Sequence, residues 1–425
     1  MKVLVVGSGA REHALTWKAL LSQLSTAVYC APGNAATAAI AVNTDIPAID
    51  VDAIVRFVKE RDVGLTVIGP EAAVEAGLAD RLAEAGRLVF GPTAAAGRIE
   101  SSKVFAKQLM SRAGVATPAY HVFDDATRAR DFARAEQRAF VVKADGLAKG
   151  KGTIVANDVE ETLRAIDQLM VDRNLGSAAD SIILEEKIDG REVSLMALVD
   201  GRNVVPMAPA CDYKRALEND EGPNTGGMGG YSPPGFFSSV DSEAAVHAVF
   251  EPVVSALAEA GTPYRGCLYA GLMVSDSGIQ VLEFNARFGD PEAQVVLPRL
   301  DSDLLSMMEA AAAGDLSASS AAWSPRPSVG VVLTSNGYPG AYEVGMPIDG
   351  LGRIERDAFV FHGATSPGPS GYETAGGRVL TVVALGDSIA EARDRAYRNV
   401  QRISFEGMSF RPDIAQREIE VAALS

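Results

Sequence analysis

The stretch Val281-Leu-Glu-Phe-Asn-Ala-Arg-Phe-Gly-Asp-Pro-Glu292 decides how the rest of the chain is interpreted. Polar and apolar residues alternate from Leu282 to Arg287, and we predict a strand from Val281 to Arg287 whose side chains point to two faces in turn. One face then packs on a core and the other is polar. The polar face carries Glu283, Asn285 and Arg287, and the face towards the core carries Leu282, Phe284 and Ala286.

Glu283 and Asn285 offer two hard oxygen ligands two residues apart. Mg²⁺ prefers such oxygens and usually shares its shell with phosphates. An edge strand with a solvated polar face is the simpler interpretation of the alternation alone. The acidic turn Phe288–Glu292, which follows at once, favours a functional strand, although it assigns no role to Asp290 or Glu292.

The length and composition indicate a globular protein of several domains. A chain of 425 residues is expected to form two to four domains of about 100–200 residues. Hydrophobic content of 47% and charged content of 22% are ordinary for a globular protein. The chain has no run of ~18 apolar residues, so no membrane span is expected, and its first residues enter a glycine turn rather than a signal-peptide cleavage site.

The net charge and the cysteines limit which binding partners and which cellular compartment are expected. The net charge of −16 disfavours nucleic-acid binding, which depends on Lys and Arg neutralising phosphates. Cys30, Cys211 and Cys267 are scattered and odd in number, so neither a disulfide framework nor a zinc site is indicated. A reducing cytoplasm is the expected location.

In residues 1–100 the pattern of a strand, a turn and a helix repeats, which predicts an open parallel sheet. Each of four predicted strands ends in a turn that contains Gly or Pro, and ligands of such sheets bind at the carboxyl ends of the strands. The predicted strands are Lys2–Val6, Ala27–Ala31, Leu65–Ile68 and Leu88–Phe90, and a helix is predicted from Arg11 to Leu21.

The turn Gly7-Ser-Gly9 resembles the start of a dinucleotide fingerprint, but two confirming features fail. Glu12 stands at the position of the third glycine, and Ala31-Pro-Gly33 stands where the acidic ribose ligand is expected. A phosphate at the helix N-terminus, near Arg11, stays possible because helix amides attract anions. A turn required only for its backbone geometry is the alternative.

A second unit combines lysines with a glycine loop. The predicted strand Phe140–Ala144 carries Lys143, and the loop Asp145–Gly152 holds three glycines and two lysines before the strand Thr153–Ala156. Loop amides and Lys charges can cover a polyphosphate, and the glycines allow movement. A flexible hairpin tip would explain the glycines but not the lysines.

The remaining segments complete the expected architecture. Glu185–Glu192 follows an apolar strand at Ser181–Leu184 and suggests a hinge that holds adenosine, or simply an acidic strand end. The Gly/Pro-rich stretch Glu221–Pro234 suggests an ordered functional loop. Helices are predicted at Ile99–Arg112, which carries Lys103 and Lys107, at Ala244–Ala260, Leu297–Ala313 and Ser388–Gln401; a hairpin is predicted from Gly271–Val274 and Gln280–Asn285, and strands at Val329–Thr334, Phe359–His362 and Val379–Ala384.

In this order the motifs resemble the ATP-grasp fold, and within it the family of phosphoribosylamine–glycine ligases. The resemblance rests on Arg287–Gln294, Gly222–Gly229, Lys143–Ala148 and Arg11–Ala14, and it extends to Gly376–Leu380. It implies an α/β protein with a parallel-sheet substrate domain at 1–100, an ATP-grasp region at 101–320 whose mobile lid is 118–192, and a small strand-rich C-terminal domain at 321–425.

The resemblance also implies a reaction and a site. Glycine would be activated by ATP as glycyl phosphate and joined to 5-phosphoribosylamine, with Mg²⁺ or Mn²⁺, in a cytoplasmic enzyme that we expect to be monomeric. Another ATP-grasp ligase of a carboxylate and an amine is the closest alternative; a dehydrogenase and a non-catalytic ATP-binding protein are disfavoured. The implied residues are Arg287, Asp212 and Lys143 for catalysis; Lys103, Lys143, Gly146, Lys149, Gly150, Gly152, Glu185, Glu186, Ile188 and Glu192 for ATP; Gly9, Arg11, Asn34, Glu71, Asp212 and Arg287 for the other substrates; and Glu283 and Asn285 for the metal.

Overall fold

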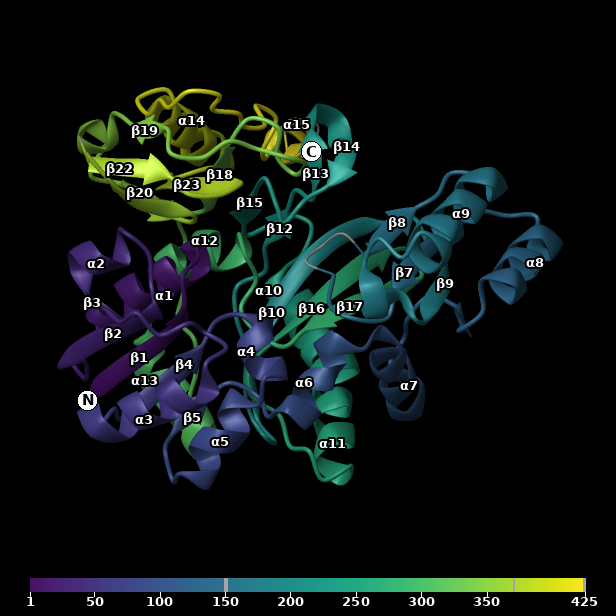
Figure 1. Ribbon diagram of the computed structural model, residues 1–425, viewed down its shortest axis with the longest axis horizontal. Coiled ribbons are helices and arrows are strands. Elements are labelled where there is room, and N and C mark those ends of the chain that lie inside the picture. The colour runs from purple at the N-terminus through teal and green to yellow at the C-terminus, as the bar shows by residue number, and fades with distance from the viewer. Residues whose placement is uncertain (149–151, 370, 423–425) are drawn as a thin grey trace.

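The N-terminal part of the chain forms the predicted open parallel sheet. The computed structural model describes residues 1–148, 152–369 and 371–422 (Figure 1). The strand order is β3-β2-β1-β4-β5 and every pairing is parallel. Helix α1 (Ala10–Leu20) covers one face, and α3 (Val51–Arg61) and α5 (Leu78–Glu84) cover the other. The strands are β1 (Lys2–Gly7), β2 (Ala27–Pro32), β3 (Val42–Asn43), which the sequence did not predict, β4 (Leu65–Ile68) and β5 (Val89–Phe90).

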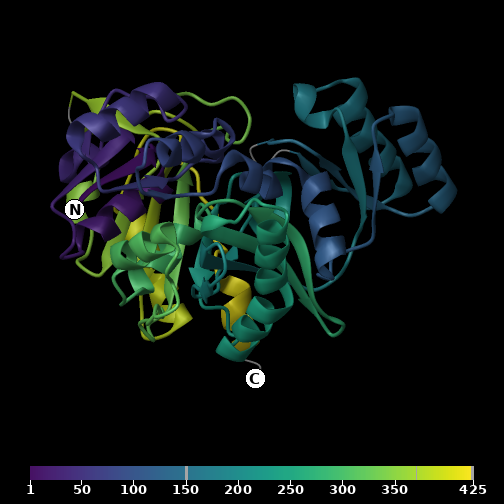
Figure 2. The ribbon, with the colours of Figure 1, turned by 90° about the horizontal axis from the view of Figure 1, so that it is seen from below.

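Within residues 118–192, for which the sequence predicts a mobile lid, a small antiparallel sheet has its own hydrophobic core, and the name lid is kept for this sheet and its helices. Both views show it projecting from the rest of the molecule (Figures 1 and 2). Its strand order is β6-β9-β7-β8, and two helices pack against it. The elements are β6 (Tyr120–Phe123), α8 (Ala126–Glu136), β7 (Phe140–Ala144), β8 (Thr153–Val155), α9 (Val159–Ile166) and β9 (Ile182–Glu186).

The central sheet carries the opening sequence motif on its edge. Its order is β11-β10-β16-β17, and the predicted hairpin is present as β16 and β17, longer than expected. Helix α11 packs on α7, and α13 packs on β10. The elements are α7 (Lys103–Ala113), β10 (Arg191–Asp200), β11 (Val204–Pro206), α11 (Glu251–Glu259), β16 (Arg265–Ser275), β17 (Gly278–Asn285) and α13 (Leu304–Ala313).

The C-terminal sheet takes strands from both sides of the border expected near residue 320. Its order is β12-β15-β18-β23-β20, so the segment that contains Asp212 and the glycine-rich loop is hydrogen-bonded into it. Helix α14 covers this sheet. The elements are β12 (Cys211–Asp212), β15 (Gly229–Ser232), β18 (Ser328–Thr334), β20 (Ala358–His362), β23 (Arg378–Leu385) and α14 (Ile389–Val400); a small sheet contains β19 (Pro347–Ile348), β22 (Gly371–Thr374) and β21 (Thr365–Gly368).

Three predicted helices have different bounds. The helix predicted at Ile99–Arg112 is two helices, α6 (Ala94–Ser101) and α7, because Ser102 is extended and its hydroxyl accepts the Phe105 amide as an N-cap. The helical run predicted at Ala244–Ala260 begins earlier, at α10 (Ser239–Ala245), and passes through a π-helical turn before α11. The helix predicted from Leu297 begins at Leu304, where Asp303 caps it.

A β-bulge at Leu282 changes the predicted two faces of β17. Glu283 pairs with Gly271 and Val281 pairs with Leu272, so Leu282 has no residue opposite it. Val281, Phe284 and Ala286 therefore face the core, and the assignment of Leu282 to that face is wrong. Glu283 and Asn285 follow the bulge and still share one face.

The described residues include no candidate for a membrane-spanning helix. No helix in ranges 1–148, 152–369 and 371–422 is both long enough and apolar enough to cross a membrane.

Candidate active site

Glu283 is a half-buried carboxylate surrounded by cations. Burial acts to raise the pKa of Glu283, but Lys103, Lys143 and Lys214 together hold it below its ordinary value. Within the described residues no group of three His, Cys, Asp or Glu side chains gathers as a complete metal cage. One carboxylate and the Asn285 amide oxygen fit Mg²⁺, which completes its shell with water and phosphates.

The lysines next to Glu283 are held by a buried glutamate. Lys143 Nζ lies 2.6 Å from Glu185 Oε1 and donates to the Leu282 carbonyl oxygen at 3.0 Å. Lys107 Nζ pairs with the other oxygen, Glu185 Oε2, and burial lowers the pKa of Lys107 to about 8. Both oxygens of Glu185, which the sequence assigned to ATP, are thus engaged by lysines, and Lys107, which the sequence left aside, completes the group.

The other predicted nucleotide contacts lie in the lid, between β9 and β10, and at the start of α7. The Glu186 amide donates to the Ala119 carbonyl at 2.8 Å, so this amide is not available to an adenine edge. The Gly146 amide likewise donates to Ala178 at 2.9 Å. Ile188 lies between β9 and β10, Gly152 begins the approach to β8, and Lys103 is the first residue of α7; Lys149 and Gly150 lie outside the described residues.

A second polar cluster brings Asp212 together with Glu292. Lys214 Nζ lies 2.9 Å from Asp212 Oδ1 and 2.7 Å from Glu192 Oε2. The Ser194 hydroxyl lies 3.3 Å from Glu292 Oε1, 3.5 Å from Asp212 Oδ1 and 2.8 Å from the Tyr269 hydroxyl. Since Lys214 contacts Asp212, we assign the negative charge to Asp212 and the proton to Glu292.

Substituting Glu292 is expected to change the pH dependence of stability. Burial raises the pKa of Glu292 to about 7, and the charge of Asp212 acts in the same direction. An unfolded Glu titrates near ~4.3, so the folded chain binds an extra proton between the two values. That contribution to stability is complete below the unfolded pKa and is lost as pH rises through about 7.

Glu292→Gln should therefore gain thermal stability relative to the unchanged chain as pH rises from 6 to 8.5. For a chain of 425 residues a gain of about 1 °C in Tm is expected for each kcal/mol, because the entropy of unfolding is about 2.1 cal/mol/K per residue. Melting curves of both proteins across this range measure it, with Glu343→Gln at an exposed loop as the control. A Tm difference that does not change with pH would contradict the assignment.

Arg287 joins the end of the central sheet to the N-terminal part. Its guanidinium lies 3.5 Å from Glu71 and 3.1 Å from Glu100, measured between nitrogen and oxygen atoms. Burial opposes the charge of Arg287, but Glu100 and Glu71 raise its pKa further. A cavity of about 320 Å³ opens beside these two glutamates, and Leu147 of the lid also lines it. Glu100 was missed because its partners lie far away in sequence.

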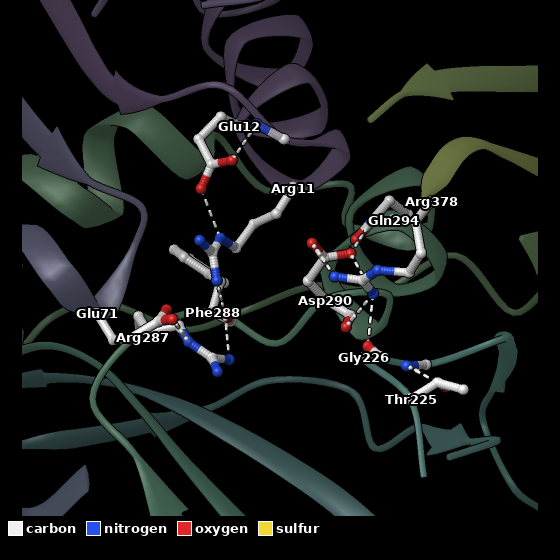
Figure 3. A network of polar contacts seen from close by, with 12 residues as sticks. Arg11, Glu12, Glu71, Thr225, Gly226, Arg287, Phe288, Asp290, Gln294 and Arg378 are labelled. Atoms are coloured by element: carbon white, nitrogen blue, oxygen red, sulfur yellow. Dashed lines mark hydrogen bonds and ion pairs between the residues drawn. The ribbon is translucent and has the colours of Figure 1, made fainter. Parts of the chain in front are cut away.

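The N-terminus of α1 is filled by the chain's own carboxylate. Glu12 Oε2 accepts the Gly9 amide at 2.7 Å, and Glu12 Oε1 lies 2.6 Å from Arg11 Nε (Figure 3). A Cβ at Gly7 or Gly69 would collide with the Glu12 side chain, so these glycines make room for it. The expected phosphate position at this terminus is therefore occupied by Glu12, and the Gly9 amide and the buried Arg11 are already engaged.

Asn34, predicted as a substrate contact, instead joins two domains. Its amide nitrogen donates to the carbonyls of Ser8 at 3.0 Å and His362 at 2.8 Å, and its oxygen accepts the Ala36 and Thr37 amides. The side chain is buried and its hydrogen-bonding capacity is used within the protein. The assignment to substrate is not supported by this geometry.

Asn34→Ala is expected to lower the free energy of unfolding by about 1–3 kcal/mol, because buried backbone groups lose their partners. Urea denaturation checks this, and Asn157→Ala on the exposed lid surface is the control. An unchanged midpoint for Asn34→Ala would show that the contact does not hold the domains together.

Comparisons with known proteins cover almost the whole chain. Family models match residues 1–100 (phosphoribosylglycinamide synthetase, N domain), 101–293 (its ATP-grasp domain) and 328–417 (its C domain). Phosphoribosylamine–glycine ligases of Halalkalibacterium halodurans and Neisseria meningitidis are each 43% identical, over 100% and 99% of this chain and 99% and 100% of theirs.

Solved structures agree with this likeness. A crystal structure of phosphoribosylamine–glycine ligase from Thermotoga maritima has a TM-score of 0.85 and 31% identity, and the match covers 98% of this chain and 100% of that one. The biotin carboxylase domain of Hydrogenobacter thermophilus 2-oxoglutarate carboxylase has a TM-score of 0.73 at 17% identity, over 99% and 98% of the chains, which shows a shared fold alone.

Proposed function

Because the chain belongs to the phosphoribosylglycinamide synthetase family, we propose that it joins glycine to 5-phosphoribosylamine at the expense of ATP. The products are glycinamide ribonucleotide, ADP and phosphate, in purine biosynthesis. The observation that carries the assignment of residues is the position of Glu283 and Asn285 on β17 beside Leu282, whose carbonyl oxygen accepts Lys143 Nζ of the lid at 3.0 Å. Nearby lysines also lower the pKa of Glu283.

In the first step an oxygen of the glycine carboxylate attacks the γ-phosphorus of ATP, and the bond to the β-phosphate oxygen breaks. Phosphoryl transfer requires chiefly positioning and neutralisation of charge. Lys143, held by Glu185, and Lys103 supply positive charge to the phosphates. The lid residues around Gly146 and Gly152, together with Lys149 and Gly150, would cover the γ-phosphate. Ile188 and Glu192 would hold adenosine, whereas the Glu186 amide and the Glu185 carboxylate are engaged within the protein.

Glu283 and Asn285 would hold a divalent ion, Mg²⁺ by preference and Mn²⁺ as a substitute, which supplies further charge neutralisation at the phosphate oxygens. The donor set of one carboxylate and one amide oxygen fits either ion.

In the second step the amine of phosphoribosylamine attacks the acyl carbon of glycyl phosphate. Phosphate leaves, an amide bond forms, and the proton lost by the amine goes to the departing phosphate. Asp212, kept anionic by Lys214, would hold the glycine ammonium. Arg287 would add positive charge beside the reacting acyl phosphate, and Glu71, at the cavity of about 320 Å³, would contact the ribosyl group. A closed lid protects the acyl phosphate from water.

The assignment is tested by ADP release with glycine and phosphoribosylamine present together and each omitted in turn. Release that depends on both is expected. ADP formed equally well with another carboxylate in place of glycine would favour a sister ATP-grasp ligase. We further propose that the enzyme acts as a monomer in the cytoplasm, which sedimentation and fractionation check directly.

A further inference from the structure

Arg378 extends from the C-terminal sheet into the junction of two turns of the central region. It is the first residue of β23, and its side chain is about three-quarters covered. Nη1 donates to the carbonyl oxygens of Gly226 and Asp290, the latter at 3.0 Å (Figure 3). Nη1 and Nη2 also reach the two carboxylate oxygens of Asp290 at 3.3 and 3.1 Å. One guanidinium therefore fastens two turns that are distant in sequence.

The first of these turns carries Thr225 and Gly226 and is tied to the segment with Asp212. Thr225 donates from its amide at 2.8 Å and from its hydroxyl at 2.9 Å to the carbonyl oxygen of Lys214. The Met228 amide donates to Tyr213 at 2.8 Å. A displacement of Gly226 is thus transmitted directly to the backbone around Lys214, whose ammonium holds Asp212.

The second turn contains Asp290 and Pro291 and connects Arg287 with Glu292. Gln294 Nε2 donates to Asp290 Oδ1 at 2.6 Å, which helps to hold this carboxylate in place. A Cβ at Gly227 would lie 2.4 Å from Pro291 Cδ, so the two turns press on each other and glycine is required at this contact. Burial acts to raise the pKa of Asp290, but Arg378 and Arg11 lower it, which keeps the ion pair charged.

We propose that Arg378 is a positioning residue of the ligation site, through which the C-terminal domain holds Asp212 and Arg287 at the correct separation for glycine. The inference rests on the proposed function, since it takes glycine as the ligand between these two side chains. Arg378 acts through Gly226 and Asp290 and need not contact the reacting atoms.

A role in domain attachment alone is the competing explanation, and the fold provides a matched control for it. Arg299 is also buried, and its guanidinium donates to the carbonyls of Arg326 and Ser324 and to the Ser232 hydroxyl. It joins the central region to the C-terminal sheet without touching either turn. Asn34 fastens the N-terminal part independently.

The experiment compares Arg378→Lys with Arg299→Lys in the full-length protein, measuring KM for glycine, KM for ATP, kcat and Tm. Lysine keeps the charge but lacks the planar fork that reaches both turns. For Arg378→Lys we expect KM for glycine to rise at least about tenfold while KM for ATP stays within about twofold. Arg299→Lys should lower Tm without separating the two KM values.

Two further measurements separate positioning from folding. Added guanidinium should restore part of the glycine affinity in Arg378→Ala. The double variant Asp290→Asn with Arg378→Lys should raise KM for glycine by less than the product of the two single increases. Equal changes in KM for glycine and KM for ATP would overturn the inference. The absence of guanidinium rescue, together with a double variant whose effect equals the product of the two single effects, would also overturn it. If the unchanged enzyme fails to release ADP with glycine and phosphoribosylamine, it is the proposed function that fails.

Discussion

Glu283→Ala is expected to lower kcat by at least about 1000-fold, a loss of about 4 kcal/mol in transition-state stabilisation, while the protein remains folded. The positive charges of Lys103, Lys143 and Lys214 hold the pKa of Glu283 below the ordinary value of a glutamate. Removing it takes away the carboxylate that fits a divalent ion and leaves the lysines to repel one another at the phosphate position.

The measurement is steady-state ADP release at several concentrations of Mg²⁺, together with a melting curve. Glu283→Gln keeps the size of the side chain and should also be severely impaired, because an amide carries no charge for a hard cation. Gln280→Ala, at a half-buried position of the same strand, is the control and should retain most activity. Activity of Glu283→Ala near that of the control would remove β17 from the centre of the mechanism.

Glu185→Ala is expected to lower the free energy of unfolding by about 3–5 kcal/mol, because it leaves buried charges without their partner. Glu185 lies between Lys107 of α7 and Lys143 of the lid strand β7, and all three side chains are nearly inaccessible to water. Two uncompensated ammonium groups in this position should also loosen the docking of the lid sheet on α7.

A triple variant separates the stability effect from the catalytic one. Glu185→Leu with Lys107→Met and Lys143→Met replaces the buried charges by apolar groups of similar size, which is often neutral or stabilising. Denaturation should then show recovered stability, whereas ADP release should stay low because Lys143 is gone. Recovery of both would mean that these lysines do not serve the phosphates. A variant that is as unstable as Glu185→Ala would mean that the charges do not dominate the energetics.

The sequence predicted the elements that depend on local pattern. The parallel strands, the lysine strand β7 and the β16–β17 hairpin are recognisable because apolar periodicity and turn residues are contained in a few adjacent positions. The bulge at Leu282 was not predictable in this way, since a bulge arises from register with the neighbouring strand. The start of α7 at Ser102 could have been predicted from the sequence, because an N-cap serine accepts the backbone amide of the residue three positions later, here Phe105.

The site residues also fall into those that local sequence can predict and those whose roles depend on distant partners. Glu283 and Asn285 were predicted as metal ligands from their spacing, which stays a prediction, but the role of Asn34 depends on His362, more than 300 residues away. Asp290 had no assignable role until Arg378 was placed beside it. Lys107 was given no role because its partner, Glu185, lies far away in sequence, in the lid.

The shared C-terminal sheet has a consequence for how the chain reaches its native state and how it can be divided. Strand β18 is buried along its length between β15 and β23, so its pairing joins positions about 100 residues apart along the chain. Such non-local pairing slows folding, and a fragment beginning near residue 320 would expose an apolar strand edge that invites aggregation. Fragments cut there should be soluble only when both halves are produced together, which makes residues 211–232 a folding partner of the C-terminal segment rather than a loop of the region before it.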